Sequence, residues 1–106
     1  MVAQQYDPKA YELYLKSKTL FAISKSSEDT ENSIEMMLEA TRTDNNLIGA
    51  KLFLGLMYEE SRDYENANKL YSRALSQSKT IGDNAIIAEA LRKQGKLSRK
   101  EKDFDG

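Results

Sequence analysis

Cysteine and histidine are absent from this chain of 106 residues, and proline occurs once. Without cysteine or histidine, disulfides, thiolate or imidazole metal sites and catalysis by either side chain are excluded. No apolar run approaches the roughly 20 residues that span a bilayer, and the N-terminus lacks the apolar core of a signal peptide. We therefore expect a cytoplasmic protein that needs no metal and no cofactor.

Charge of one sign is also lacking, since 16 lysines and arginines nearly balance 17 aspartates and glutamates. The net charge of −1 argues against a general attraction to nucleic acid or to an anionic membrane. Sequence patterns such as a phosphate-binding loop or a nucleophile elbow are missing as well. Acidic clusters such as Glu59-Glu60 are interpreted as solvated helix surface. We expect no enzyme activity.

Helical periodicity and cap residues predict an all-α chain with no strand. Asp7, Asp63 and Asp83 stand where the first free N–H groups of a helix need an acceptor, and Gly82 stands where a helix ends. The predicted helices cover approximately 8–25, 28–43, 46–62, 64–80 and 84–101, and residues 102–106 are predicted to form a loop.

The predicted helices repeat along the chain. Three positions of the second helix recur 34 residues later, in the fourth: Ser33, Met37 and Ala40 match Ala67, Tyr71 and Ala74. Ser17 in the first helix matches Gly55 in the third at an offset of 38, and Gly55 matches Gly95 in the fifth at 40. The changes in offset fall in the connections, so the packing positions within the helices are preserved.

This pattern resembles the tetratricopeptide repeat family, a helix–turn–helix unit of about 34 residues with a W-x2-L-G-x2-Y…A-x3-F signature. Lys51 stands in the tryptophan position, and the closing proline of the family is missing. The resemblance implies about two and a half antiparallel helix pairs, stacked as a short right-handed α-solenoid. Its signature residues here are Leu54, Gly55, Tyr58, Ala67, Tyr71, Ala74 and Gly95.

Gly55 indicates a close approach between two helices. Glycine is about 1 kcal/mol worse than alanine inside a helix, so its presence suggests that the fourth helix packs against it. We expect that contact at Ala67, with Tyr58 and Tyr71 filling the space beside the crossing. Leucine at position 55 or 67 is predicted to overpack the contact.

We expect a single domain over residues 1–106 that is a fragment of a longer protein. Asp103-Phe104 lies 40 residues after the predicted turn at Asp63-Tyr64, which predicts a further turn there. The last helix would then have a bare face near Leu91 and Gly95. Such a face could pair with a second copy, so a homodimer is one expected state.

The family binds peptides in a concave groove formed by the first helix of each pair. The resemblance therefore implies a protein–protein interaction module, part of a signalling or regulatory protein, with a protein or peptide partner and neither nucleic acid nor membrane. The residues predicted to bind the partner are Tyr14, Lys18, Leu52, Phe53, Leu56, Arg92, Lys93 and Lys96. Further lining residues are expected at Tyr11, Phe21, Glu59, Glu89, Arg99 and Lys100.

Alternatives remain for these residues. Leu52, Phe53 and Leu56 are equally compatible with packing between repeats, and Tyr14 with the core. The basic face of the last helix suits plain solvation or an acidic peptide; nucleic acid is the third interpretation, disfavoured because the chain is slightly acidic and no aromatic residue interleaves the cluster. Family members that grip a C-terminal carboxylate need asparagines where this chain has Lys18 and Phe53, so that mode is disfavoured. A structural module that self-associates through its end helices is the alternative function.

Overall fold

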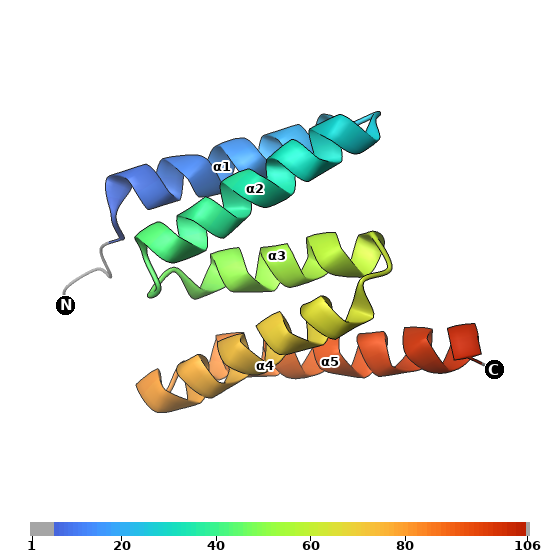
Figure 1. The fold of residues 1–106 in the computed structure, drawn as a ribbon. Helices are drawn as coiled ribbons and strands as arrows, with labels where there is room; N and C mark the ends of the chain where they lie inside the picture. The colour runs from blue at the N-terminus through green and yellow to red at the C-terminus, as the bar shows by residue number, and fades with distance from the viewer. Residues whose placement is uncertain (1–5, 106) are drawn as a thin grey trace. The chain divides into compact units, whose positions relative to one another are not determined.

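The computed structural model describes residues 6–105, with side chains for residues 6–102. Five helices follow one another, and no strand occurs in this described part (Figure 1). The helices are α1 (Pro8–Ile23), α2 (Ser27–Thr43), α3 (Ile48–Glu60), α4 (Tyr64–Ile81) and α5 (Asn84–Asp105). The prediction of an all-α helical repeat with five helices is confirmed.

Helices α1, α4 and α5 start at predicted cap residues, and α4 ends at one. Asp7 Oδ1 accepts the backbone N–H of Lys9 at 2.9 Å, where α1 begins. The carboxylates of Asp63 and Asp83 accept in the same way at the start of α4 and α5. Gly82 ends α4 with a φ of 74°, a left-handed conformation that costs glycine nothing.

The predicted loop over residues 102–106 is wrong for the described residues, because α5 continues to Asp105. The turn predicted at Asp103-Phe104 by analogy with Asp63-Tyr64 is therefore not made. In the real turn Arg62 adopts a φ of 65°, and the N–H of Asp63 donates to the carbonyl of Tyr58 at 2.8 Å. The segment before Asp103 consists of arginine, lysine and glutamate, which favour continued helix. Gly106 lies outside the described residues.

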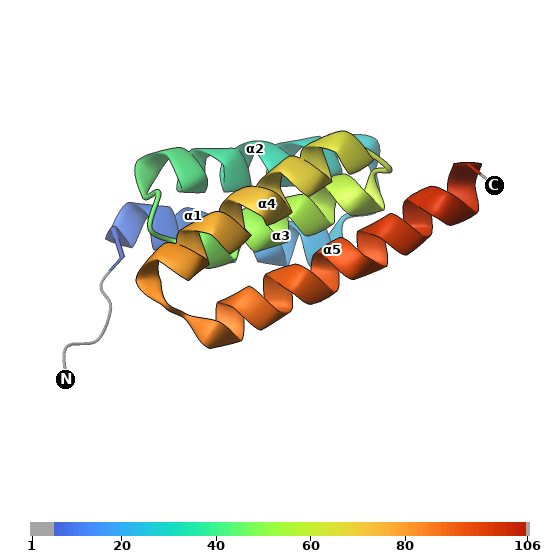
Figure 2. The same cartoon turned by 90° about the horizontal axis from the view of Figure 1, so that it is seen from below.

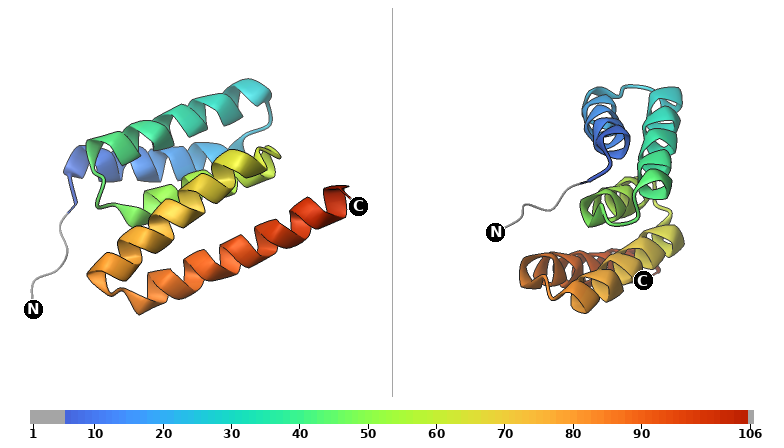
Figure 3. Two further views of the ribbon diagram at one scale, coloured as in Figure 1. Left: turned by 60° about the horizontal axis from the view of Figure 1, so that its bottom comes forward. Right: turned by 90° about the vertical axis from the view of Figure 1, so that its left-hand side faces the viewer.

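Two compact units divide the chain after Ala50, so that α3 begins at the end of the first unit and continues in the second. In the first unit, α1 and α2 run antiparallel (Figure 3). Asp44 Oδ2 accepts the N–H of Asp7 at 2.8 Å, which ties the end of α2 to the start of α1. Near the middle of both helices, Ser17 Oγ donates to the carbonyl of Ser33 at 2.6 Å, and both serines are fully buried. Small side chains thus let the two helices cross closely.

In the second unit, α3, α4 and α5 alternate in direction (Figure 2). Gly55 on α3 packs against Tyr71 of α4, whose ring supplies the three atoms nearest to a Cβ built on Gly55. A Cβ built on Gly55 would lie 2.7 Å from Tyr71 Cδ1. Long side chains on a helix lean toward its N-terminus, so the ring of Tyr71 covers the turn that carries Ala67. Ala67 is fully buried and leaves room for that ring.

The predicted register of the repeat is confirmed by burial. The six matched positions of α2 and α4 are each 0% exposed: Ser33, Met37, Ala40, Ala67, Tyr71 and Ala74. Lys51, in the tryptophan position, is also buried and donates through Nζ to Gln77 Oε1 on α4. Burial lowers the pKa of the Lys51 ammonium, and the nearby charge of Arg73 lowers it further.

Candidate peptide-binding groove

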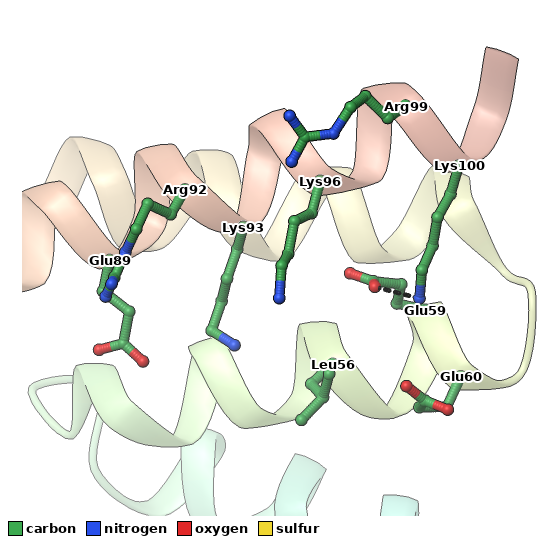
Figure 4. A pocket seen from close by; sticks show the side chains of 9 residues that line it. All are labelled: Leu56, Glu59, Glu60, Glu89, Arg92, Lys93, Lys96, Arg99 and Lys100. Carbon is green, nitrogen blue, oxygen red and sulfur yellow. Dashed lines mark ion pairs between the residues drawn. The ribbon is translucent and has the colours of Figure 1, made fainter.

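An open groove of about 750 Å³ lies between α3 and α5 in the second unit (Figure 4). From α3 it is lined by Leu56, Glu59 and Glu60. From α5 it is lined by Glu89, Arg92, Lys93, Lys96, Arg99 and Lys100. The α5 residues recur at intervals of three and four, which places them on one side of the helix. The chain as a whole is slightly acidic, so this concentration of cations is local.

Glu59 joins the three helices of the second unit. Its side chain is only 6% exposed. Oε1 accepts the hydroxyl of Tyr71 on α4 at 2.8 Å, and Oε2 pairs with Nζ of Lys100 on α5 at 2.6 Å. The interpretation of Glu59 as solvated surface is therefore wrong, whereas Glu60 is exposed. A buried carboxylate needs such partners because its desolvation is costly.

The same contacts shift two pKa values. The hydrogen bond to Glu59 raises the pKa of the Lys100 ammonium, against the smaller opposing effect of burial. Burial raises the pKa of the Tyr71 hydroxyl, and its hydrogen bond to Glu59 raises it further. At neutral pH the tyrosine is thus a hydrogen donor and Lys100 is a cation, and together they satisfy Glu59.

The other four cations of the groove differ from Lys100 in their pairing. Among the side chains of residues 6–102, Arg92, Lys93, Lys96 and Arg99 form no ion pair. Five cationic and three acidic side chains line the groove in total. Since Lys100 already pairs with Glu59, the four remaining cations leave the groove with a positive local charge.

The structure brings together four of the residues predicted to bind a partner. Leu56, Arg92, Lys93 and Lys96 all line the groove. Leu56 is half-buried, and it is the apolar side chain among the lining residues. Glu60 was the one lining residue that sequence reasoning did not place there. Its position one residue after Glu59, on the last turn of a helix, carried no distinguishing signal.

The other predicted residues lie elsewhere. Leu52 and Phe53 do not line this groove, and Leu52 is only 4% exposed. Tyr14 and Lys18 belong to the first unit, on α1. There the Lys18 Nζ lies 5.0 Å from the centre of the Tyr14 ring, close enough for a cation–π contact. The ring of Tyr11 lies 5.9 Å from that of Tyr14, so the start of α1 carries an aromatic cluster.

Solved structures with the same fold are known. A solution structure of a tetratricopeptide repeat domain protein from Salinibacter ruber superposes with a TM-score of 0.74. The match covers 86% of this chain and 89% of that chain, at 17% sequence identity. The fold is that of a tetratricopeptide repeat. A crystal structure of a tetratricopeptide repeat domain protein from Salinibacter ruber matches with a TM-score of 0.71 and 16% identity, over 84% of this chain and 94% of that one.

At this level of identity the likeness concerns the fold. The sequence matches no protein-family model and no curated protein. In the tetratricopeptide frame, α1, α3 and α5 are the first helices of their pairs, and α2 and α4 are the second. The groove between α3 and α5 is therefore formed by two first helices.

The described residues offer neither a metal site nor a membrane-spanning helix. No group of three or more acidic side chains in that part of the chain could hold a metal ion. None of the described helices is both long and apolar enough to cross a membrane.

Proposed function

We propose that this tetratricopeptide-like chain is a protein-interaction module that binds a segment of a partner protein in the α3–α5 groove. Helical repeats of this fold typically mediate protein–protein interaction. The observation that carries the proposal is the set of four cations, Arg92, Lys93, Lys96 and Arg99, that form no ion pair with the side chains of residues 6–102 and lie beside the half-buried Leu56. Charged side chains that find no partner within the chain remain available to a ligand of opposite charge.

The dimensions of the groove support this function. Clefts that hold ligands commonly have volumes of about 300–1,000 Å³. The α3–α5 groove falls in that range and combines one apolar contact with a row of cations. The proposed setting, a larger signalling or regulatory protein in the cytoplasm, rests on the family resemblance.

Selection from a random-peptide library tests the proposal. Peptides enriched on the wild-type chain are expected to lose binding to Lys96→Glu, which reverses one charge in the groove. They should still bind Lys102→Glu, because Lys102 is an exposed cation on the same helix that does not line the groove. The proposal fails if no peptide is enriched, or if the enriched peptides bind both variants equally well.

Four residues predicted to bind the partner do not line the α3–α5 groove: Tyr14, Lys18, Leu52 and Phe53. Tyr14 and Lys18 are proposed as partner contacts of the first unit, and Tyr14→Ala with Lys18→Ala would test them in the same selection. The burial of Leu52 means that a substitution there would change packing before it changed binding. Phe53 is half-buried and lies outside the groove, so we propose no role for it.

Self-association is a second candidate function, favoured by the outer surface of α5. Leu91 is 50% exposed, and a Cβ built on Gly95 would meet no atom within 4 Å. A second copy could pack a helix on this surface. Sedimentation velocity should then show a dimer for the wild-type chain and a monomer for Leu91→Lys. A wild-type monomer at high concentration would exclude this function.

A further inference from the structure

We propose that the α3–α5 groove recognises an internal, extended acidic segment in which carboxylate and apolar side chains alternate. This inference rests on the proposed function and specifies the ligand of the same site. It follows from the chemistry of the two walls, from the spacing of the cations and from the carboxylates at the two ends.

The two walls of the groove differ in chemistry. The α5 wall carries the cations, and Figure 4 shows Lys93 and Lys96 reaching from α5 into the groove, toward the side where α3 presents Leu56. Successive side chains of an extended chain point to opposite sides. A segment lying along the groove would therefore direct one row of side chains to α5 and the other row to α3. Acids in the first row and apolar residues in the second match the two walls.

The spacing of the cations fits the same conformation. Arg92 and Lys96 are four residues apart, which is about 6 Å along a helix. Side chains on one side of an extended chain recur every two residues, at about 6.6 Å. Two acids separated by one residue would therefore face Arg92 and Lys96 together, and a third would reach Arg99. Each apolar residue between them would face the wall that carries Leu56.

The distribution of charge favours an internal segment over a chain end. A terminal carboxylate concentrates its charge at one point and needs donors that converge there. From Arg92 to Arg99 the cations extend over about 10 Å of helix. Such a row can engage several separate carboxylates, and no single anion can contact all of it.

Carboxylates bound the cationic row at both ends. Glu89 precedes Arg92 on α5, and Glu60 follows Leu56 on α3. Glu59 is already paired with Lys100 and hydrogen-bonded to Tyr71, so its charge is compensated. An anionic ligand that continued past the row would meet Glu89 or Glu60. This repulsion limits the ligand to a short acidic stretch and disfavours a long polyanion such as nucleic acid.

Fluorescence anisotropy with three labelled peptides tests the inference. All are acetylated and amidated, so that no chain end carries a charge. The first has the order Glu-Leu-Glu-Leu-Glu between glycines, the second contains the same residues as Glu-Glu-Glu-Leu-Leu, and the third replaces each glutamate of the first by glutamine. We expect the alternating acidic peptide to bind about tenfold or more tightly than either of the others.

Charge-reversal variants test whether the preference for the alternating peptide arises in the groove. Arg92→Glu and Lys96→Glu should each abolish the preference for the alternating peptide, whereas Lys102→Glu should keep it. An unlabelled single-stranded oligonucleotide of the same charge should compete poorly. Equal affinity for the alternating and the block peptide, or equal competition by the oligonucleotide, would overturn the inference. If library-selected peptides still depend on Lys96 in that case, the interaction function stands and only the ligand class is wrong.

Discussion

The ring of Tyr71 lies directly against the backbone of Gly55, and its hydroxyl donates to Glu59 one turn further along α3. Tyr71 is fully buried and Glu59 nearly so. One side chain of α4 therefore explains both a glycine and a buried carboxylate of α3. Since Glu59 also holds Lys100 of α5, the position of this ring affects the wall of the groove.

Gly55→Ala is expected to destabilise the chain. The added methyl would lie 2.7 Å from Tyr71 Cδ1, and the ring is held at its other end by Glu59. Overpacking of this kind costs about 1–3 kcal/mol, which exceeds the gain of about 1 kcal/mol in helix propensity. Thermal melts followed by circular dichroism should show a melting temperature several degrees lower.

Gly95→Ala is the matched control, because the equivalent position on α5 has nothing within 4 Å of a built Cβ. Here only the helix propensity changes, so the melting temperature should rise. The account of the Gly55 contact is wrong if both alanine variants shift the melting temperature in the same direction.

The pattern of small residues predicted this contact only in part. It indicated that α4 approaches Gly55, because glycine is otherwise unfavourable inside a helix. It placed Tyr71 only beside a contact centred on Ala67, whereas the ring of Tyr71 supplies the atoms nearest to Gly55, because long side chains lean toward the N-terminus of their helix. The role of Glu59 was not predictable for a similar reason. Helical spacing placed Glu59 on the groove side of α3, but its two partners lie on other helices, so its burial and its pairing could not be predicted from the local sequence.

Tyr71→Phe should reduce stability and also change its dependence on pH. Near neutral pH the loss of the hydrogen bond to a buried carboxylate should cost about 1.5–3 kcal/mol. The folded protein raises the pKa of Tyr71, so its contribution is complete below the unfolded pKa of about 10 and declines as the pH rises above it. Wild-type stability should therefore fall above about pH 10, and less steeply in the variant.

Urea unfolding at about pH 8 and pH 11 measures both effects. Lys100 contributes in the same direction, because its pKa is also raised in the folded protein. Some alkaline loss should therefore remain in Tyr71→Phe. The exposed Tyr11→Phe serves as the control and should follow the wild type. An identical pH dependence in wild type and Tyr71→Phe would contradict the role given to this hydroxyl.

Ser17 tests the close crossing of the first unit. Ser17→Ala removes the hydrogen bond to the carbonyl of Ser33 and should cost about 0.5–1.5 kcal/mol. Ser17→Val adds bulk between α1 and α2 and should cost more, about 1–3 kcal/mol in addition. Ser98→Ala changes an exposed serine and should have little effect. Chemical denaturation would place the three variants in order, and a valine variant as stable as the alanine variant would argue against a tight crossing.

The end of α5 could not be predicted from the offset between repeats alone. The equivalence between Asp103 and Asp63 was sound as a sequence offset, but it ignored the residues before each aspartate. Arg62 adopts a left-handed backbone conformation, and the N–H of the next residue, Asp63, donates to the carbonyl of Tyr58 at the end of α3. The run Arg99-Lys100-Glu101-Lys102 favours helix, and α5 continues through it. The caps at Asp7, Asp63 and Gly82 were predictable because each depends only on its immediate neighbours.

The paired and unpaired cations of the groove should differ in their effect on peptide binding. Lys100→Gln combined with Glu59→Gln removes both charges of one ion pair and leaves the net charge of the groove unchanged, so the alternating acidic peptide should lose little affinity. Lys96→Gln removes a cation without an ion pair and should weaken binding severalfold. Fluorescence anisotropy with the same peptide compares the two. A larger loss for the double variant than for Lys96→Gln would contradict the role given to the cations outside the Glu59–Lys100 pair.

The most direct test of the central claim is a titration of ¹⁵N-labelled protein with the alternating acidic peptide, followed by amide chemical shifts. The claim predicts saturable shifts concentrated around Leu56 on α3 and from Arg92 to Arg99 on α5, with Lys69 on the exposed side of α4 unchanged. Shifts that stay absent at millimolar peptide, or that appear on α4 and not along the groove, would contradict it.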